Sequence, residues 1–298
     1  MIEADNALLT LRDWLRYAVS RFTAGGLFFG HGTTNAFDEA VWLILHTLHL
    51  PHDRLDPFLD ARLTGDERIA LRRVIDRRVN ERLPAAYLTN EAWLRDYRFY
   101  VDQRVIVPRS YVAELIFDDV FAAWLPDREA VGDALDMCTG SGCLAVVLAD
   151  AYPNAAVDAV DVSAEALDVA RRNIAEHGLD QRIRLVACDL FAGLAGRRYD
   201  LIISNPPYVT AAAIDALPPE YRHEPMLALA AGPDGLGIVR RLLAEAGGYL
   251  APDGVLAVEV GHNRALVERA FPHLPMVWLA ADSGEDKVFL VERSALPG

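Results

Sequence analysis

Basic residues are scarce in this chain of 298 residues, and so are long apolar runs. There are 29 Lys and Arg against 43 Asp and Glu, which gives a net charge of −14 and no surplus of cations for binding a nucleic-acid backbone. No stretch approaches the roughly 18 to 20 uninterrupted apolar residues of a membrane helix. Residues 1–5 are acidic and polar, unlike a secretory signal. We therefore expect a cytoplasmic protein with no membrane partner and no sequence-specific nucleic-acid contact.

Cysteine is also scarce, with Cys138, Cys143 and Cys188 as its three positions and no CxxC spacing among them. An odd number without metal-ligand spacing favours small packing residues in a reducing compartment over a disulfide or a metal site. Hydrophobic residues make up 52% and charged residues 24%, as in a soluble globular protein. The length suits two domains.

The first 90 residues carry a helical pattern. Apolar residues at helical spacing predict helices over about 8–22, 40–48 and 66–79. The charged run 76–82 is typical of a solvated helix face. Aromatic and β-branched residues over 91–110 then favour two short strands, with Asp102-Gln103 as the turn between them, and Trp93 as a core aromatic. Ser110 is the expected N-cap of a helix that begins near Tyr111.

From about residue 132 the chain alternates strand and helix. Short apolar runs predict strands over 134–137, 156–161, 183–187, 201–204 and 255–259, with helical stretches such as 164–177 and 235–246 between them. Alternation of this kind predicts an α/β, Rossmann-like sheet that is mostly parallel. Two last runs, 276–280 (with Trp278 as a core aromatic) and 288–291, are separated by the polar segment 282–286 and predict an antiparallel edge hairpin.

A glycine-rich turn follows the first of these strands. It reads Asp136-Met137-Cys138-Thr139-Gly140-Ser141-Gly142, and its glycines permit a tight turn and close approach of a ligand to the backbone. A carboxylate at the end of the second strand, Asp161, can accept both ribose hydroxyls. Asp189, followed by Leu190, ends the third strand and is placed to accept from an exocyclic amine.

The turn alone is ambiguous, because its spacing also satisfies the G-x-G-x-x-G/A fingerprint of nicotinamide-dependent oxidoreductases. The late start of the unit and its antiparallel final hairpin argue against that class. So does the tetrapeptide Asn205-Pro206-Pro207-Tyr208 after the fourth strand. Two prolines fix the backbone, so the Asn205 side-chain oxygen and the Pro206 carbonyl can face one NH₂ group. Tyr208 offers a flat face for stacking. The tetrapeptide therefore indicates methyl transfer to a planar nitrogen, an amide or an arylamine.

In combination, these motifs resemble a known family. Pro108-Arg109, the turn from Asp136 to Gly142, the tetrapeptide at 205–208 and Glu224-Pro225 together are similar to the HemK-type protein-(glutamine-N5) methyltransferases, over nearly the whole chain. The resemblance implies S-adenosylmethionine as methyl donor and a glutamine side-chain amide as acceptor. It divides the chain into a helical substrate-recognition domain (1–90), a β-hairpin linker (91–110) and a methyltransferase domain (111–298).

Two branches of this family modify different substrates: peptide chain release factors or the large-subunit ribosomal protein L-three. The stretch 14–22, the motif Pro108-Arg109-Ser110 and Cys138 resemble the ribosomal-protein branch, while the release-factor branch stays an alternative. A nucleobase amino methyltransferase is a more remote one, and the missing basic groove argues against it. The expected catalytic residues are Asn205, Pro206, Pro207 and Tyr208. The expected cofactor-binding residues are Cys138, Thr139, Gly140, Ser141, Gly142, Asp161, Asp189, Leu190 and Asn205. The expected substrate-binding residues are Asn205, Pro206, Tyr208, Phe99 and Arg109.

Overall fold

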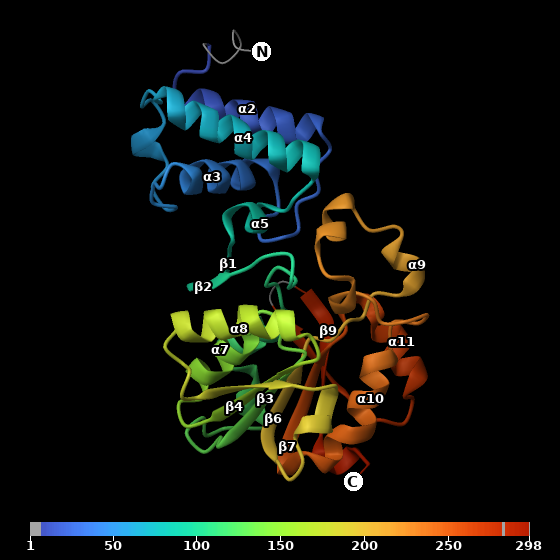
Figure 1. Cartoon of the computed structure of the whole chain (residues 1–298). Helices are drawn as coiled ribbons and strands as arrows, with labels where there is room; N and C mark the ends of the chain where they lie inside the picture. The colour runs from blue at the N-terminus through green and yellow to red at the C-terminus, as the bar shows by residue number, and fades with distance from the viewer. Residues whose placement is uncertain (1–6, 282–283, 298) are drawn as a thin grey trace.

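A computed structural model describes residues 7–281 and 284–297. A small helical unit stands above a larger α/β unit, and the chain ends near the base of the sheet (Figure 1). The helical unit contains α2 (Leu11–Ala24), α3 (Ala36–Thr47), α4 (Gly65–Glu81) and the short α5 (Ala85–Thr89). These elements confirm the three predicted helices with ends moved by a few residues. No helix within the described part of the chain is long and apolar enough to cross a membrane.

Local sequence sets where these helices begin. Thr10 and Thr64 each form a capping box with the acidic residue three positions later, and the Asn35 side chain accepts from the backbone at the start of α3. Such caps satisfy N–H groups that have no partner inside the helix, and each is worth about 1 kcal/mol. The apolar faces meet in a core that includes Trp14, Phe22 and Leu43.

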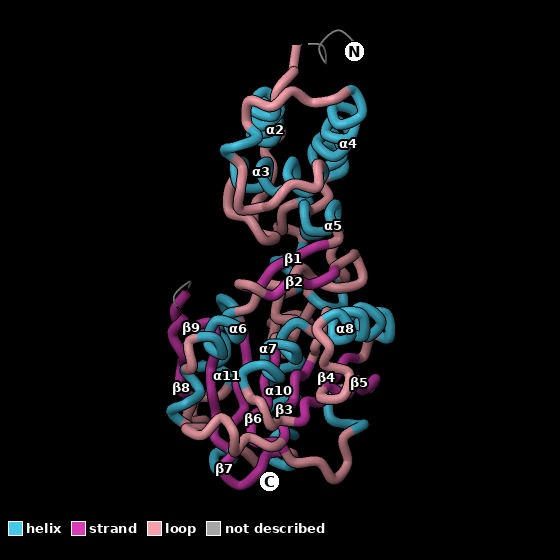
Figure 2. Tube along the Cα trace, turned by 90° about the vertical axis from the view of Figure 1, so that its left-hand side faces the viewer, coloured by secondary structure: helices cyan, strands magenta, loops and turns pink. Residues whose placement is uncertain are grey.

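A two-stranded hairpin, β1 (Glu91–Leu94) and β2 (Tyr97–Tyr100), lies between the helical unit and the sheet (Figure 2). The predicted turn at Asp102-Gln103 is wrong, because the chain reverses at Arg95-Asp96. Arg95 adopts a left-handed φ of 49°, a conformation that suits a tight turn. The segment after Tyr100 is irregular and runs down to the sheet.

The α/β unit is built on a seven-stranded sheet in the order β5-β4-β3-β6-β7-β9-β8. Pairing is parallel from β5 to β7 and antiparallel from β7 to β8, which confirms the predicted fold class. Its strands are β3 (Asp133–Met137), β4 (Ala156–Asp161), β5 (Ile183–Ala187), β6 (Tyr199–Ser204), β7 (Leu250–Glu259), β8 (Val277–Ala281) and β9 (Gly284–Glu292). Its helices are α6 (Tyr111–Phe117), α7 (Cys143–Ala151), α8 (Ala164–Glu176), α9 (Ala211–Ile214), α10 (Gly237–Glu245) and α11 (Arg264–Ala270).

The parallel strands explain where a ligand site forms. Strands β3, β4 and β6 are buried on both faces, because α6, α7 and α8 contribute to one apolar core and α10 to the other, whereas β5 is an edge strand and only partly buried. Their carboxyl ends all lie at the edge of the sheet that faces the hairpin, where open α/β sheets bind ligands. Ser110 caps α6 as predicted, since its side chain accepts from Val112 N.

The final two strands form the predicted antiparallel hairpin at the edge of the sheet. The segment 284–286, predicted as part of its loop, belongs to β9 instead. Asp282 and Ser283 lie outside the described residues.

Trp278 packs edge-on against Phe289, with ring centroids 5.6 Å apart, whereas Trp93 is 39% exposed and is not a core residue.

An ionic network joins the helical unit to the α/β unit. The charged run at the end of α4 was expected to face solvent, but Arg78 is only 1% exposed. Its Nε donates to Glu39 Oε1 at 2.6 Å, and its Nη1 donates to Glu220 Oε1 at 3.2 Å. Arg82 also reaches Glu220, at 3.2 Å. A buried guanidinium is tolerated here because carboxylates from both units compensate it.

Candidate functional site

The carboxyl ends of four parallel strands open onto one cavity. Cys138 follows β3, Asp161 ends β4, Asp189 follows β5 and Asn205 follows β6, and each lines this cavity. The Ser204 hydroxyl donates to Met137 O at 2.8 Å and ties the ends of β6 and β3 together. Three further segments contribute to its lining, through Arg104, Val105 and Ile106; Val162, Ser163 and Ala166; and Pro225, Leu227, Ala228 and Ala230.

Side chains of the glycine-rich turn itself stabilise its conformation. The Thr139 hydroxyl donates to Asp136 Oδ2 at 2.5 Å, and burial raises the pKa of Asp136 to about 7. Gly140 has a φ of +54°, and a Cβ built on it would meet no atom within 4 Å, so its backbone is open to a ligand. Gly142 (φ +79°) is the N-cap of α7, and a Cβ there would lie 3.1 Å from Ala170 of α8. Thus Gly140 faces the cavity, whereas Gly142 permits close packing of two helices.

Asp161 connects this turn to β4. Its Oδ2 accepts from Gly140 N and its Oδ1 from Ser163 N, both at 2.9 Å. Burial raises the pKa of Asp161, and the two N–H groups oppose that rise. A carboxylate has about four acceptor positions, so each oxygen can still accept one hydroxyl of a ribose. The fixed carboxylate beside an open glycine backbone fits the expected S-adenosylmethionine.

Two residues at the cavity adopt backbone conformations that normally favour glycine. Cys138 has a φ of 66° and Leu190 a φ of 49°. The left-handed region costs a non-glycine residue about 1 kcal/mol or more, and such strain concentrates at ligand sites. Burial also raises the pKa of the Cys138 thiol, so it is a neutral packing group rather than a nucleophile.

Asp189 lines the cavity with an exposed side chain and forms an ion pair with Arg241 of α10, with Oδ1 and Nη1 2.9 Å apart. One carboxylate oxygen can still accept from an exocyclic amine. Thr139 and Ser141 are buried and do not line the cavity. Their side chains and backbone shape the turn.

The tetrapeptide divides between two environments. Asn205 and Pro207 line the cavity, whereas Pro206 is buried and Tyr208 lies on the side toward α6 and the end of β7. Asn263 Nδ2 donates to Tyr208 O at 2.6 Å. Burial raises the pKa of Tyr208, so its hydroxyl stays protonated.

Arg109 lies beside the tetrapeptide and pairs with Glu224. Its two terminal nitrogens, Nη1 and Nη2, donate to the Glu224 carboxylate, each at 2.6 Å, and Val107 N donates to the same carboxylate at 3.0 Å. Burial alone would raise the pKa of Glu224, but the Arg109 guanidinium, with His31 nearby, holds it at about 2. His31 Nε2 lies 3.7 Å from Glu224 and, within the described chain, neither of its ring nitrogens has a hydrogen-bond partner. Arg109 therefore holds the segment before Pro225 against the linker.

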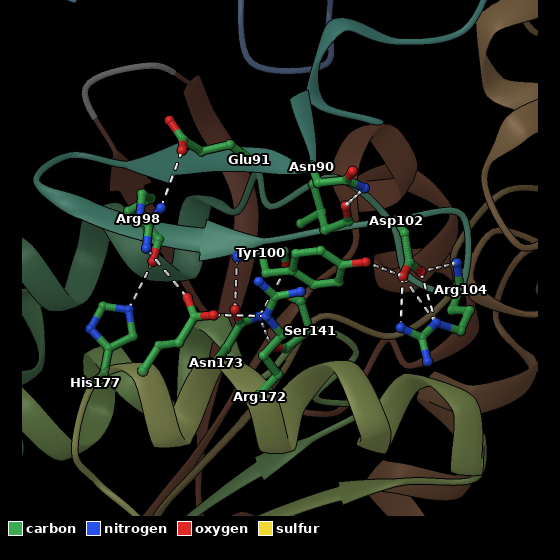
Figure 3. A network of polar contacts seen from close by, with 12 residues as sticks. Asn90, Glu91, Arg98, Tyr100, Asp102, Arg104, Ser141, Arg172, Asn173 and His177 are labelled. Carbon is green, nitrogen blue, oxygen red and sulfur yellow. Dashed lines mark hydrogen bonds and ion pairs between the residues drawn. The ribbon is translucent and has the colours of Figure 1, made fainter. Parts of the chain in front are cut away.

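A second network joins the hairpin to the glycine-rich turn (Figure 3). The Asn173 amide, on α8, accepts from Tyr100 N at 2.7 Å and donates to Tyr100 O and to Ser141 O, at 3.0 and 2.8 Å. Asp102 accepts from Tyr100 OH at 2.9 Å and binds the Arg104 guanidinium at 2.6 Å. These bonds fix the hairpin relative to the cavity. They also hold Arg104 where it lines the cavity.

Phe99 is not part of this cavity. Its side chain is fully buried in the core beside α6 and α7, contrary to the expectation that it borders the site. The cavity residues of the linker are instead Arg104, Val105 and Ile106. In the sequence, only their position directly before Pro108-Arg109 could have indicated that these three residues reach the site. Val162 was also missed, although an apolar residue directly after Asp161, the carboxylate expected to bind the ribose, could have indicated it.

Sequence and structure comparisons relate this chain to known proteins. Residues 118–217 match a family model described as "Methyltransferase small domain". A "Ribosomal protein uL3 glutamine methyltransferase" of Bordetella pertussis is 58% identical over 289 residues, 97% of each chain. Proteins of the same name from Burkholderia pseudomallei and Neisseria gonorrhoeae are 57% and 55% identical over 100% and 99% of this chain, and 99% and 98% of theirs. A solved structure of the hMettl16 catalytic domain is 14% identical, with a TM-score of 0.49 over 80% of this chain and 84% of that one.

Proposed function

This chain belongs to the ribosomal protein uL3 glutamine methyltransferase family, and on that premise we propose how its residues methylate a glutamine of that protein. The reaction transfers a methyl group from S-adenosylmethionine to the side-chain amide nitrogen. The family assignment agrees with the substrate branch that the sequence indicated. The observation that carries the residue-level proposal is that Gly140, Asp161 and Asn205 line one cavity at the ends of adjacent strands.

We assign cofactor binding to the turn and the two strand-end carboxylates. When bound, the cofactor supplies an electrophilic methyl group on a sulfonium sulfur. Asp161 accepts from the ribose hydroxyls, and its bonds to Gly140 N and Ser163 N keep it oriented. The open Gly140 backbone lets the rest of the molecule approach closely. Asp189 accepts from the exocyclic amine of the adenine.

Asn205 and Pro206 hold the glutamine amide. An amide nitrogen is a poor nucleophile because its lone pair is delocalised into the carbonyl, and no base strong enough to deprotonate it is available in water. The Asn205 side-chain oxygen and the Pro206 carbonyl accept from its two N–H groups. Positive charge develops on nitrogen as the new C–N bond forms and the S–C bond breaks, so these acceptors bind the transition state more tightly. The proton leaves the nitrogen afterwards.

The helical unit, residues 1–90, is the part that we assign to recognition of the protein substrate, with the hairpin region 91–110 as its linker. We assign Arg109 an indirect part in substrate recognition: it acts through its ion pair with Glu224 and does not contact the glutamine amide. Since the substrate is a ribosomal protein, we place the reaction in the cytoplasm.

A labelling experiment tests the substrate. The purified protein is incubated with methyl-labelled S-adenosylmethionine and with uL3 or a release factor, and mass spectrometry locates the methyl group. We expect label on a glutamine side chain of uL3. Label on the release factor alone, or on a residue other than glutamine, contradicts the proposal.

Replacing the acceptor side chain tests the mechanism. Asn205→Ala removes one of two acceptors that strengthen in the transition state, so kcat should fall roughly 100- to 1000-fold. Cofactor affinity by calorimetry should change only a few-fold. Asn154→Ala, which removes an amide on the surface, is the matched control and should retain full turnover. Turnover by Asn205→Ala close to that of the control would exclude the assigned role.

A further inference from the structure

The segment directly after β7 surrounds Tyr208. Glu259 is the last residue of β7, and the chain continues through Val260, Gly261 and His262 to Asn263. Three residues of this segment contact different parts of Tyr208: Glu259 its hydroxyl, Gly261 its ring and Asn263 its backbone carbonyl. None of these three residues has a role in the function proposed above.

Gly261 leaves the ring of Tyr208 room to lie against the backbone. Gly261 has a φ of +53°, and a Cβ built on it would lie 2.7 Å from Tyr208 Cε2 and 3.1 Å from Cζ. A side chain here would both strain the backbone and displace the ring. On the other side, Asn263 Nδ2 holds the Tyr208 carbonyl at 2.6 Å, so the main chain of the tetrapeptide cannot move freely.

Glu259 connects the hydroxyl of Tyr208 to the start of α6. Its side chain is 1% exposed. Oε2 accepts from Ser110 Oγ at 2.7 Å and from Tyr111 N at 2.9 Å, while Oε1 accepts from Tyr208 OH at 3.5 Å. Tyr111 N can only donate, and both hydroxyls donate in this arrangement, so the ionised carboxylate, which only accepts, satisfies all three contacts at once.

We propose that Glu259, Gly261 and Asn263 are positioning residues for methyl transfer, because they fix the ring of Tyr208 against which the planar amide of the substrate glutamine stacks. The inference rests on the proposed function for its substrate. A shift of the ring moves the amide out of line with the methyl group, and misplacement by about 1 Å can cost a hundredfold in rate. The effect belongs to kcat, since the cofactor cavity does not include these three residues.

The same geometry gives the reaction a dependence on pH. Burial raises the pKa of Glu259 to about 7, with Arg109 as the opposing cation. The other titratable groups that face it are the hydroxyls of Tyr111 and Tyr208, whose raised pKa values keep them protonated. Below about pH 7 the carboxyl gains a proton, Oε1 no longer binds Tyr208 as well, and turnover falls.

Two variants with matched controls test the proposal. Gly261→Ala should lower kcat roughly 10- to 100-fold with little change in cofactor affinity. Gly248→Ala, where a Cβ meets no atom within 4 Å, should match the wild type. Glu259→Gln should remove the acidic decline in kcat, so that its rate varies little between about pH 6 and 8. Asp158→Asn, which removes a buried carboxylate bound by Tyr199 and Arg184, should lower stability and keep the decline.

A measurement without turnover separates this inference from the proposed function. Fluorotyrosine at position 208 reports the environment of the ring by ¹⁹F NMR. Its resonance should move with a midpoint near pH 7 in the otherwise unchanged protein and should not move in Glu259→Gln. If the resonance titrates in this way but the protein does not methylate uL3, the proposed substrate is wrong and the positioning role is still supported. A resonance independent of pH, or Gly261→Ala with the kcat of Gly248→Ala, would overturn the inference.

Discussion

Replacing Arg78 by methionine should destabilise the protein strongly, because this buried guanidinium compensates carboxylates from both units. Arg78→Met keeps the apolar stem but removes the bonds to Glu39, to Glu220 and to Phe28 O, which Arg78 Nη2 reaches at 2.8 Å. Glu220 retains Arg82 and the backbone N–H of Phe28. Glu39, which is 1% exposed, retains the Thr33 hydroxyl at 3.0 Å. The variant therefore leaves one buried carboxylate without its main cation.

The cost can be bounded from the titration of Glu39. An unpaired buried carboxylate can take up a proton, and from its ordinary pKa of 4.5 this costs at most about 3.4 kcal/mol at pH 7, at 1.36 kcal/mol per pH unit. The lost bond to Phe28 O adds about 1 kcal/mol. We therefore expect a loss of roughly 3 to 4 kcal/mol at pH 7, in the range found when one partner of a buried pair is removed. At pH 5 protonation costs about 0.7 kcal/mol, so the loss should shrink to roughly 2 kcal/mol or less.

Denaturant unfolding at pH 7 and pH 5 measures both values. Arg77→Met is the matched control, since Arg77 lies next to Arg78 on α4, is 46% exposed and pairs with Glu81 four residues later. An exposed pair of this kind contributes about 0.5 kcal/mol or less. A cost of Arg78→Met no larger than that of Arg77→Met would refute the assigned compensation. A cost equal at both pH values would refute the role given to Glu39.

Three further outcomes follow from the site. Asp161→Ala should weaken cofactor binding at least tenfold by calorimetry, because the ribose loses its acceptor, and an unchanged Kd would contradict that role. At position 138, Cys138→Gly should change the free energy of unfolding by less than about 1 kcal/mol, whereas Cys138→Val should lower it by roughly 2 kcal/mol, because a β-branched residue resists a positive φ. Because burial raises the pKa of Asp136 to about 7, its contribution to stability is present at low pH and is lost as pH rises toward 7. Asp136→Asn should therefore gain roughly 2 kcal/mol relative to the wild type between about pH 5 and pH 7 in denaturant unfolding.

The chemistry was predictable from sequence because its signals are local. A glycine-rich turn, a carboxylate after the next strand and an Asn-Pro-Pro-Tyr tetrapeptide each occupy the end of an apolar run. Parallel pairing then brings such ends together whatever the details of packing, as Cys138, Asp161 and Asn205 illustrate. The first helices were predictable for the same reason, since their apolar spacing and caps lie within a few residues.

The tertiary structure decided which distant segments complete the site. Arg78 and Glu220 are 142 residues apart, and Ser110 and Glu259 are 149 apart, so no local pattern pairs them. Periodicity indicated an exposed face for Arg78, because a helix pattern does not reveal which partner covers it. It likewise could not tell that Ile106 rather than Phe99 reaches the cavity. The sequence by itself determined the reaction, whereas packing between segments decided how the reacting residues are held.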